Sequence, residues 1–167
     1  GTENVAALEK GLPNLLKHID NLKNAFGLPV VVAINRFQSD SDAELALIEK
    51  TCAERGVKIA LCEVWAHGGK GGEALARAVI DTCEQGASRC APLYPDDLPL
   101  TEKIRTIAQK LYGAADIALS DDARKTLQDL EKLGYGNLPV CMAKTQYSLS
   151  DDPKALGCPQ GFTLNIR

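Results

Sequence analysis

Residues 59–80 read IALCEVWAHGGKGGEALARAVI, an apolar run followed by a glycine-rich segment and then by a run with helical periodicity. A strand, a glycine-rich loop and a helix in this order let backbone N–H groups and a helix N-terminus face a bound anion. The same segment contains the only tryptophan, Trp65, and one of the two histidines, His67. The stretch therefore predicts a strand–loop–helix unit with a ligand site at its loop.

The segments before this stretch predict that its strand belongs to a parallel sheet. Residues 29–34, PVVVAI, form a continuous apolar run, which is typical of a strand buried on both faces. Ser41 and Glu44 have the spacing of a capping box and predict a helix that Gly56 ends. Residues 57–62 then predict a second buried strand. This β-α-β-α order indicates an α/β fold with a parallel sheet.

The outer parts of the chain predict helices, a loop and two more strands. In residues 3–25, which have helical periodicity, Pro13 is expected to begin a second helical piece. Beyond the sheet we expect a loop at residues 86–99 and two helices, at 101–112 and 120–134, that form a helical excursion. A buried strand at 138–143 and a closing strand at 162–166 are expected to follow. The expected division is an α/β half at 1–95, the excursion at 96–136 and a return at 137–167, together one compact unit.

Composition and charge exclude several classes of protein. With 167 residues, 45% of them hydrophobic and 25% charged, the chain has an ordinary globular composition. Its net charge of −3 favours neither nucleic acid nor an anionic membrane as a partner. No apolar run approaches the length that spans a bilayer. We therefore expect a soluble protein.

The cysteines point to free thiols. None of the six forms a CxxC pair or has a histidine at zinc-finger spacing. Cys62 and Cys141 lie inside apolar runs, where a free cysteine behaves as a small buried hydrophobic residue. A reducing compartment fits this pattern better than a disulfide framework.

Three loops follow predicted strands, at residues 35–40, 64–72 and 144–152. In open parallel sheets, ligands bind beyond the carboxyl ends of the strands. The glycine loop contains the candidate anion-binding residues Gly68, Gly69, Lys70 and Gly71. Its spacing is not that of a Walker A motif, and a flexible turn is the alternative interpretation.

Two aromatic residues and a few polar ones are further candidates. Phe37 and Trp65 each come just after a predicted strand, where a planar ligand can stack on them. Packing in the core is an equally open interpretation, because it accounts for most Phe and Trp residues. Asn35, Lys144 and Thr145 are candidates for contacts to a nucleotide, and an ordinary polar loop is the alternative.

Three motifs of this chain resemble the formate–tetrahydrofolate ligase (10-formyltetrahydrofolate synthetase) family, at residues 30–37, 63–72 and 137–153. The similarity extends over essentially the whole chain. It implies a P-loop-type three-layer α/β/α fold of which this chain holds part of the sheet. It also implies ATP-driven ligation of formate onto N10 of tetrahydrofolate, with Mg²⁺ and an activating monovalent cation, in a cytosolic homotetramer.

The resemblance assigns roles to particular residues. It implies that the folate ring stacks between Phe37 and Trp65 and that Leu61 lines the same pocket. Gln38 stands where the family usually has proline, so the apolar floor of the pocket is weakened at that position.

The resemblance also implies what this chain lacks. The family's Walker A loop, its catalytic lysine and the arginine that holds the acyl phosphate lie in an earlier part of the enzyme, and this chain resembles the C-terminal third. We therefore expect no catalytic residue and no metal ligand here, no activity of this fragment alone, and the remainder of the enzyme as a partner. The alternatives are a stand-alone nucleotide-binding module that uses Asn35, Lys144 and Thr145, or an interaction module that uses residues 101–134.

Overall fold

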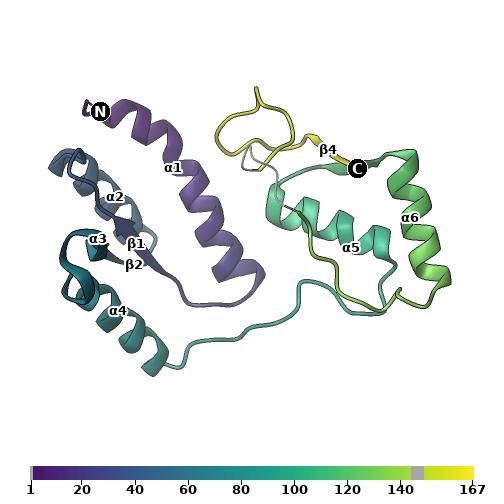
Figure 1. The fold of residues 1–167 in the computed structure, drawn as a ribbon, viewed down its shortest axis with the longest axis horizontal. Helices are drawn as coiled ribbons and strands as arrows, with labels where there is room; N and C mark the ends of the chain where they lie inside the picture. Colours follow the sequence, from purple (N-terminus) through teal and green to yellow (C-terminus); the bar gives the residue numbers. More distant parts are fainter. Residues whose placement is uncertain (1, 144–148) are drawn as a thin grey trace. The chain divides into compact units, whose positions relative to one another are not determined.

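The computed structural model describes residues 2–143 and 149–167. Backbone contacts divide the chain into two compact units, Gly1–Cys90 and Ala91–Arg167 (Figure 1). Segments 96–136 and 137–167, expected as separate parts, lie in the same second unit. Each unit contains helices and a pair of parallel strands, which confirms the α/β class. The P-loop-type detail stays a prediction.

The first unit is built around two parallel strands. Its elements are α1 (Val5–Asp20), η1 (Asn21–Ala25), β1 (Val31–Asn35), α2 (Asp42–Glu54), β2 (Lys58–Cys62), α3 (Val64–His67), η2 (Gly68–Gly72) and α4 (Glu73–Glu84). Asn35 is the register partner of Cys62, so both strands end at the same edge of the sheet. Helix α2 contacts β2 and helix α4 contacts both strands, and Figure 1 shows the strands between these helices. Strands therefore form where residues 29–34 and 57–62 predict them, but Ala33 in β1 and Lys58 in β2 are exposed, so the expectation that the first strand is buried on both faces is wrong.

The start of α2 is fixed by the predicted capping box. The Glu44 N–H donates to the Ser41 hydroxyl, and the Glu44 carboxylate accepts from the Ser41 N–H, both at 3.2 Å. The same carboxylate accepts from the Asn4 N–H at 2.9 Å, which ties α2 to the start of α1. The hydrogen bonds from Asn4 and then from Ser41 lower the pKa of Glu44. These contacts make the start of α2 a fixed reference for the loop that precedes it.

The core of the first unit joins α1 and α2 to one face of the sheet. Ile19, Cys52 and Val57 are buried together, and burial raises the pKa of the Cys52 thiol. Helix α1 continues through Pro13 from Val5 to Asp20, so the expectation that Pro13 begins a second helical piece is wrong. The loss of one backbone hydrogen bond at a proline is outweighed here by the burial of the apolar face of α1.

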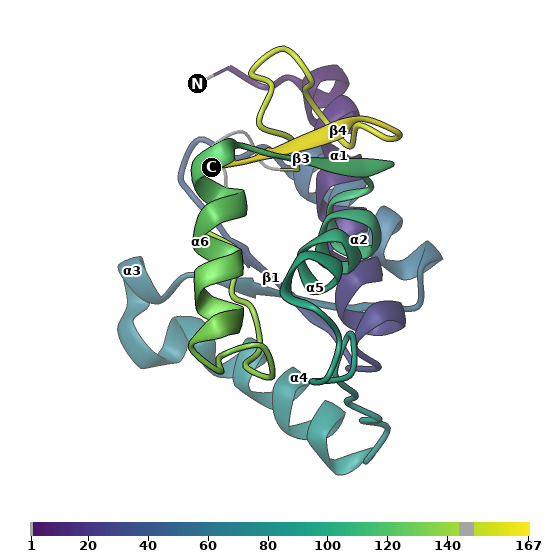
Figure 2. The same ribbon diagram turned by 90° about the vertical axis from the view of Figure 1, so that its right-hand side faces the viewer.

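The second unit repeats a parallel pair of strands. Its elements are α5 (Leu100–Ile107), η3 (Ala108–Tyr112), β3 (Asp116–Leu119), α6 (Asp121–Lys132) and β4 (Thr163–Ile166). Strand β3 pairs in parallel with β4, and the two lie side by side in Figure 2. The core of the unit contains Ala108, Ala114 and Leu164. The closing strand expected at residues 162–166 is confirmed, whereas β3 lies inside the expected helical excursion.

The buried strand expected at residues 138–143 does not form. Leu138 is exposed, and the backbone of this segment is bound by side chains instead of by a neighbouring strand. Lys103 Nζ donates to the carbonyl oxygens of Gly136 and Leu138, at 2.7 and 2.9 Å. The Tyr94 hydroxyl accepts from the Val140 N–H at 2.9 Å and donates to the Val140 carbonyl at 3.2 Å. These backbone groups therefore have partners without a sheet.

The cysteines are free thiols in the structure. Cys62 lies in β2 and is half-buried. Cys141 is exposed, so the expectation that it is a buried apolar residue is wrong. Its exposure follows from the missing strand, because the apolar run around Cys141 has no sheet to join.

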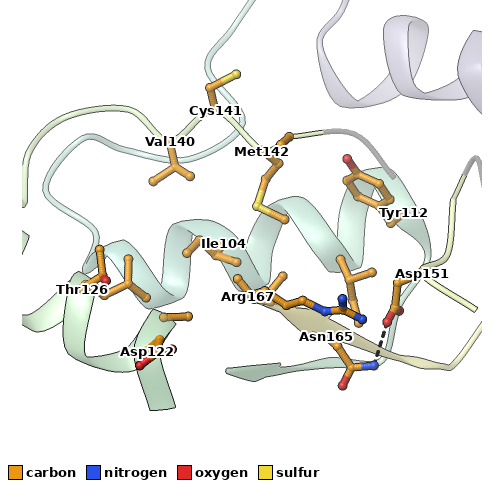
Figure 3. A pocket seen from close by; sticks show the side chains of 15 residues that line it. Ile104, Tyr112, Asp122, Thr126, Val140, Cys141, Met142, Asp151, Asn165 and Arg167 are labelled. Atoms are coloured by element: carbon orange, nitrogen blue, oxygen red, sulfur yellow. Dashed lines mark hydrogen bonds between the residues drawn. The ribbon is translucent and has the colours of Figure 1, made fainter. Parts of the chain in front are cut away.

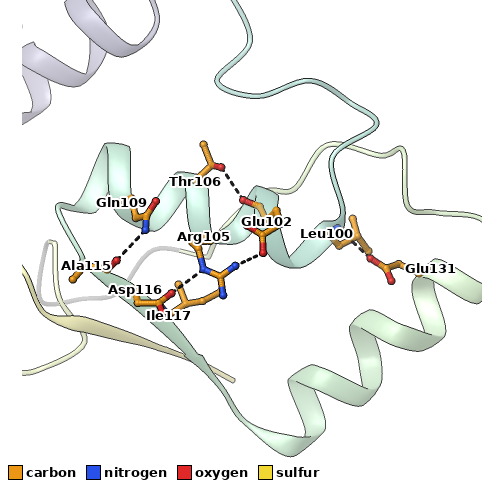
Figure 4. A network of polar contacts seen from close by, with 9 residues as sticks. All are labelled: Leu100, Glu102, Arg105, Thr106, Gln109, Ala115, Asp116, Ile117 and Glu131. Atoms are coloured by element: carbon orange, nitrogen blue, oxygen red, sulfur yellow. Dashed lines mark hydrogen bonds and ion pairs between the residues drawn. The ribbon is translucent and has the colours of Figure 1, made fainter.

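A polar network joins α5 to β3 (Figure 4). Arg105 Nε donates to the Asp116 carboxylate at 2.8 Å, and the guanidinium also contacts the Glu102 carboxylate. The same Asp116 oxygen accepts from the Ile117 N–H at 2.8 Å. The hydrogen bond from Arg105, followed by that from Ile117, lowers the pKa of Asp116. The network fixes the start of a strand whose sequence gives little signal of its own.

The lowered pKa of Asp116 predicts a pH dependence of stability. Because the folded pKa lies below the ordinary value, the stabilisation is fully present above the ordinary value and is lost as the pH falls through the folded pKa. We expect Asp116→Asn to unfold at a lower urea concentration near pH 7 and to lose less stability on acidification than the wild type. Urea unfolding between pH 7 and pH 3 measures this. Asp96→Asn, in an exposed loop, is the control, and equal acid sensitivity of Asp116→Asn and wild type would contradict the prediction.

Candidate functional site

The predicted aromatic residues lie at the carboxyl edge of the first sheet. Phe37 follows the end of β1, and Trp65 lies in α3, which follows the end of β2. Phe37 is 57% exposed and Trp65 is 53% exposed. Packing in the core of the first unit therefore does not hold these rings in place. Both remain accessible for stacking on a planar ligand.

One peptide group connects the two aromatic residues. Trp65 Nε1 donates to the Arg36 carbonyl oxygen at 2.7 Å. The N–H of the same Arg36–Phe37 peptide donates to Asp40 Oδ2 at 2.8 Å. The Asp40 N–H donates back to the Phe37 carbonyl at 3.1 Å. Sequence reasoning missed Arg36 and Asp40. The available signal was an aspartate in a short turn directly before a helix cap, which is a common place for side-chain-to-backbone bonds.

The Arg36 side chain reaches the two elements beside this peptide. Its guanidinium lies 3.4 Å from an Asp42 carboxylate oxygen and 3.9 Å from a Glu63 carboxylate oxygen. The Asp42 side chain is 97% exposed, so that ion pair contributes little to stability. The contact to Glu63 places a charge pair directly before α3, next to Trp65.

The glycine segment forms a compact turn. Instead of the expected open loop, α3 continues into a 3₁₀ turn over Gly68–Gly72. The Glu63 N–H donates to the Gly71 carbonyl at 3.0 Å, and a Cβ on Gly71 would lie 2.4 Å from the Glu63 carbonyl oxygen. Gly69 has open space around it, and Lys70 is exposed. Close backbone approach at Gly71 is therefore the structural requirement in this turn.

The other predicted site residues divide into two groups. Leu61 is a half-buried residue of β2, Asn35 is the exposed last residue of β1, and Gln38 is exposed in the turn after β1. They lie in the same unit as Phe37 and Trp65 and come from the same two strands or the turn after β1. The remaining candidates, Lys144 and Thr145, lie outside the described residues.

The second unit contains a separate cavity of about 490 Å³ (Figure 3). Its walls are mostly apolar and include Ile104 and Met142, and an Asn165–Asp151 hydrogen bond of 2.7 Å lies at its side. Tyr112 also lines it, and burial raises the pKa of that phenol. None of the residues predicted for folate stacking lines this cavity.

Residues 2–143 and 149–167 contain neither a cluster of metal-binding side chains nor a membrane-spanning helix. No group of three or more His, Cys, Asp or Glu side chains gathers there in a way that would hold a metal ion. In the same residues, no helix combines the length and the apolar character needed to cross a membrane.

Comparison with known proteins identifies the family of the chain. The formate–tetrahydrofolate ligase family matches residues 1–167. The chain is 54% identical over 167 residues to the formate–tetrahydrofolate ligases of Maricaulis maris (strain MCS10) and of Paracoccus denitrificans (strain Pd 1222). Each alignment covers 100% of this chain and 30% of the relative. These alignments do not bear out the expectation that the chain comes from the C-terminal third of the enzyme. The chain belongs to the formate–tetrahydrofolate ligase family.

Proposed function

We propose that this chain is the folate-binding portion of an ATP-dependent ligase that joins formate to tetrahydrofolate, giving 10-formyltetrahydrofolate, ADP and phosphate. Family membership over residues 1–167 supports the ligase. The observation that carries the folate role is the pair Phe37 and Trp65. Both are more than half exposed, and Trp65 is hydrogen-bonded to the peptide that precedes Phe37.

The proposed role is positioning of the folate. Ligation needs the weakly nucleophilic N10 to lie close to an acyl phosphate, and holding reactants in place supplies much of the rate in such reactions. The rings of Phe37 and Trp65 fix the plane of the pterin, and Leu61 contacts it from β2. Gln38 places an amide at the floor of the folate pocket, which would otherwise be apolar. None of these residues needs to transfer a proton.

We assign the phosphate chemistry to the remainder of the enzyme. A Walker A motif is absent from this sequence, and the described residues offer no cluster of metal ligands. ATP, Mg²⁺ and the monovalent cation are therefore proposed for the whole ligase, where Mg²⁺ would neutralise charge on the transferring phosphoryl group. Asn35, with Lys144 and Thr145, is proposed to lie near the nucleotide. A cytoplasmic homo-oligomer completes the proposal.

A titration of the chain with tetrahydrofolate tests the folate role. Trp65 is the only tryptophan, so quenching of its fluorescence reports a ligand bound between Trp65 and Phe37. Calorimetry measures the same affinity without the fluorophore. We expect measurable binding by the wild type and none by Trp65→Ala. His67→Ala, an exposed neighbour in α3, is the control and is expected to bind normally.

A parallel titration with ATP separates the alternatives. Tight ATP binding without tetrahydrofolate binding would favour a stand-alone nucleotide module and contradict the folate role. With ATP, Mg²⁺, formate and tetrahydrofolate together, we expect no 10-formyltetrahydrofolate from this chain alone. Product formation would contradict the assignment of phosphate chemistry to the remainder of the enzyme.

A further inference from the structure

We infer that Asp40 is a positioning residue for the folate slot: its carboxylate holds the Arg36–Phe37 peptide, and that peptide orients the Trp65 indole. The inference rests on the proposed function for its ligand and on two hydrogen bonds for its geometry. Asp40 Oδ2 accepts from the Phe37 N–H at 2.8 Å, and the Arg36 carbonyl accepts from Trp65 Nε1 at 2.7 Å. These two hydrogen bonds belong to a single peptide group.

The peptide transmits the position of Asp40 to Trp65. The N–H and C=O of a planar trans peptide point in opposite directions, so the two hydrogen bonds form a chain from carboxylate to indole. An ionised carboxylate is a strong acceptor, and it polarises the peptide whose carbonyl holds the indole. Loss of the carboxylate therefore weakens the hydrogen bond to Trp65 as well as the one that it makes itself.

Trp65 depends on these two hydrogen bonds because the core does not enclose its ring. The side chain is 53% exposed and belongs to α3, a helix of four residues. Packing in the core therefore does not set the angle of the indole. A hydrogen bond at the ring nitrogen sets it, and the other wall of the slot, Phe37, begins at the same peptide.

Asp40 is itself held in place. Its N–H donates to the Phe37 carbonyl at 3.1 Å, which closes the turn between β1 and α2. The next residue, Ser41, is the N-cap of α2 and is fixed by the capping box with Glu44. The carboxylate is thus anchored to the rigid end of α2, so that helix serves as the reference for both aromatic walls.

A neighbouring aspartate provides a matched control. Asp42 lies in the first turn of α2, has the same charge and contacts the Arg36 guanidinium at 3.4 Å, not the Arg36–Phe37 peptide. If charge at the helix N-terminus were the relevant property, loss of Asp42 would have the same effect as loss of Asp40. If the hydrogen bond to the peptide is the relevant property, only loss of Asp40 changes folate binding and the indole.

The experiment measures tetrahydrofolate affinity by calorimetry and the hydrogen exchange of the Trp65 indole N–H by NMR, in the whole chain. We expect Asp40→Ala to bind about tenfold more weakly, in line with the loss of a charge-assisted hydrogen bond. Its indole N–H should exchange faster. Asp40→Asn keeps an acceptor and is expected to recover most of both properties. Asp42→Ala is expected to behave as the wild type in both measurements.

A double variant tests whether Asp40 acts through the indole N–H. Trp65→Phe keeps an aromatic wall and removes the donor, so adding Asp40→Ala to it should cost less affinity than in the wild type. Equal costs in both backgrounds, or unchanged indole exchange in Asp40→Ala, would overturn the inference. If the wild type does not bind tetrahydrofolate, the proposed function is contradicted. The positioning role is then decided by indole exchange alone, since that readout needs no ligand.

Discussion

Gly71→Ala is expected to lower the free energy of unfolding of the first unit by about 2 kcal/mol, the usual cost of forcing a methyl group into filled space. A Cβ at this position would lie 2.4 Å from the Glu63 carbonyl oxygen and 2.8 Å from the Val64 nitrogen. Both atoms are backbone, so the methyl group cannot be accommodated by a change of rotamer. The turn has to move away from the end of β2.

The same substitution is expected to disturb the slot. Gly71 accepts from the Glu63 N–H at 3.0 Å, and Glu63 directly precedes α3, which contains Trp65. Moving the turn therefore moves the start of α3. We expect the fluorescence of Trp65 to change in the folded Gly71→Ala variant and its tetrahydrofolate affinity to fall together with the stability.

Gly69→Ala is the matched control. It adds the same methyl group to the same 3₁₀ turn, and no atom lies within 4 Å of the added carbon. We expect its stability to remain within about 0.5 kcal/mol of the wild type. Urea unfolding followed by Trp65 fluorescence measures both variants. Equal stabilities of Gly71→Ala and Gly69→Ala would show that the contact at Gly71 does not constrain the turn.

The contrast between these glycines shows what sequence reasoning could and could not predict. The order of strand, glycine segment and helix was correct for β2 and α4 because long apolar and amphipathic runs determine those elements locally. The same reasoning treated Gly68, Gly69, Lys70 and Gly71 as one anion-binding loop. Only Gly71 makes a close backbone approach, and its partner Glu63 lies on the other side of α3 in the sequence. Distances of that kind cannot be read from composition.

The candidate site shows the same limit. The positions of Phe37 and Trp65 at one edge of the sheet could be predicted because each follows a strand and parallel strands end at one edge, whereas their role in folate stacking stays a prediction. Asp40 could not, because its role depends on which way the Arg36–Phe37 peptide faces. The sequence does not show that direction, nor that the carbonyl of the same peptide accepts from the Trp65 indole in α3.

The second unit was harder to predict because its strand pairing is not local. Strand β3 has only four residues, starts with Asp116 and pairs with a strand that begins at Thr163. No feature of the sequence near Asp116 indicates that this strand pairs with residues 163–166. In contrast, the apolar run at 138–143 has the composition of a strand but lies where side chains bind its backbone. Tertiary contacts override local preference in both cases.

Lys103 makes the clearest tertiary contact of this kind, because its side chain binds backbone carbonyls of residues 136–140. We expect Lys103→Ala to lower the free energy of unfolding of the second unit by about 3 kcal/mol. Its side chain is fully buried, and its ammonium donates to the carbonyls of Gly136 and Leu138, with the Tyr94 ring 6.0 Å away. Truncation leaves two carbonyls without their donor and opens space beside α5. Lys103→Met, which fills most of the space but donates nothing, should cost less.

Hydrogen exchange of amides in residues 91–143 is the suitable measurement, because the only tryptophan lies in the first unit. We expect Lys103→Ala to accelerate exchange most strongly around Val140, whose N–H is held by the Tyr94 hydroxyl. Lys125→Ala, on the exposed side of α6, is the control and should exchange as the wild type does. Tyr94→Phe removes the hydroxyl while keeping the ring, so it should accelerate exchange at Val140 but not in α5. If Lys103→Ala matched Lys125→Ala, the buried ammonium would not be what replaces a strand partner for residues 136–140.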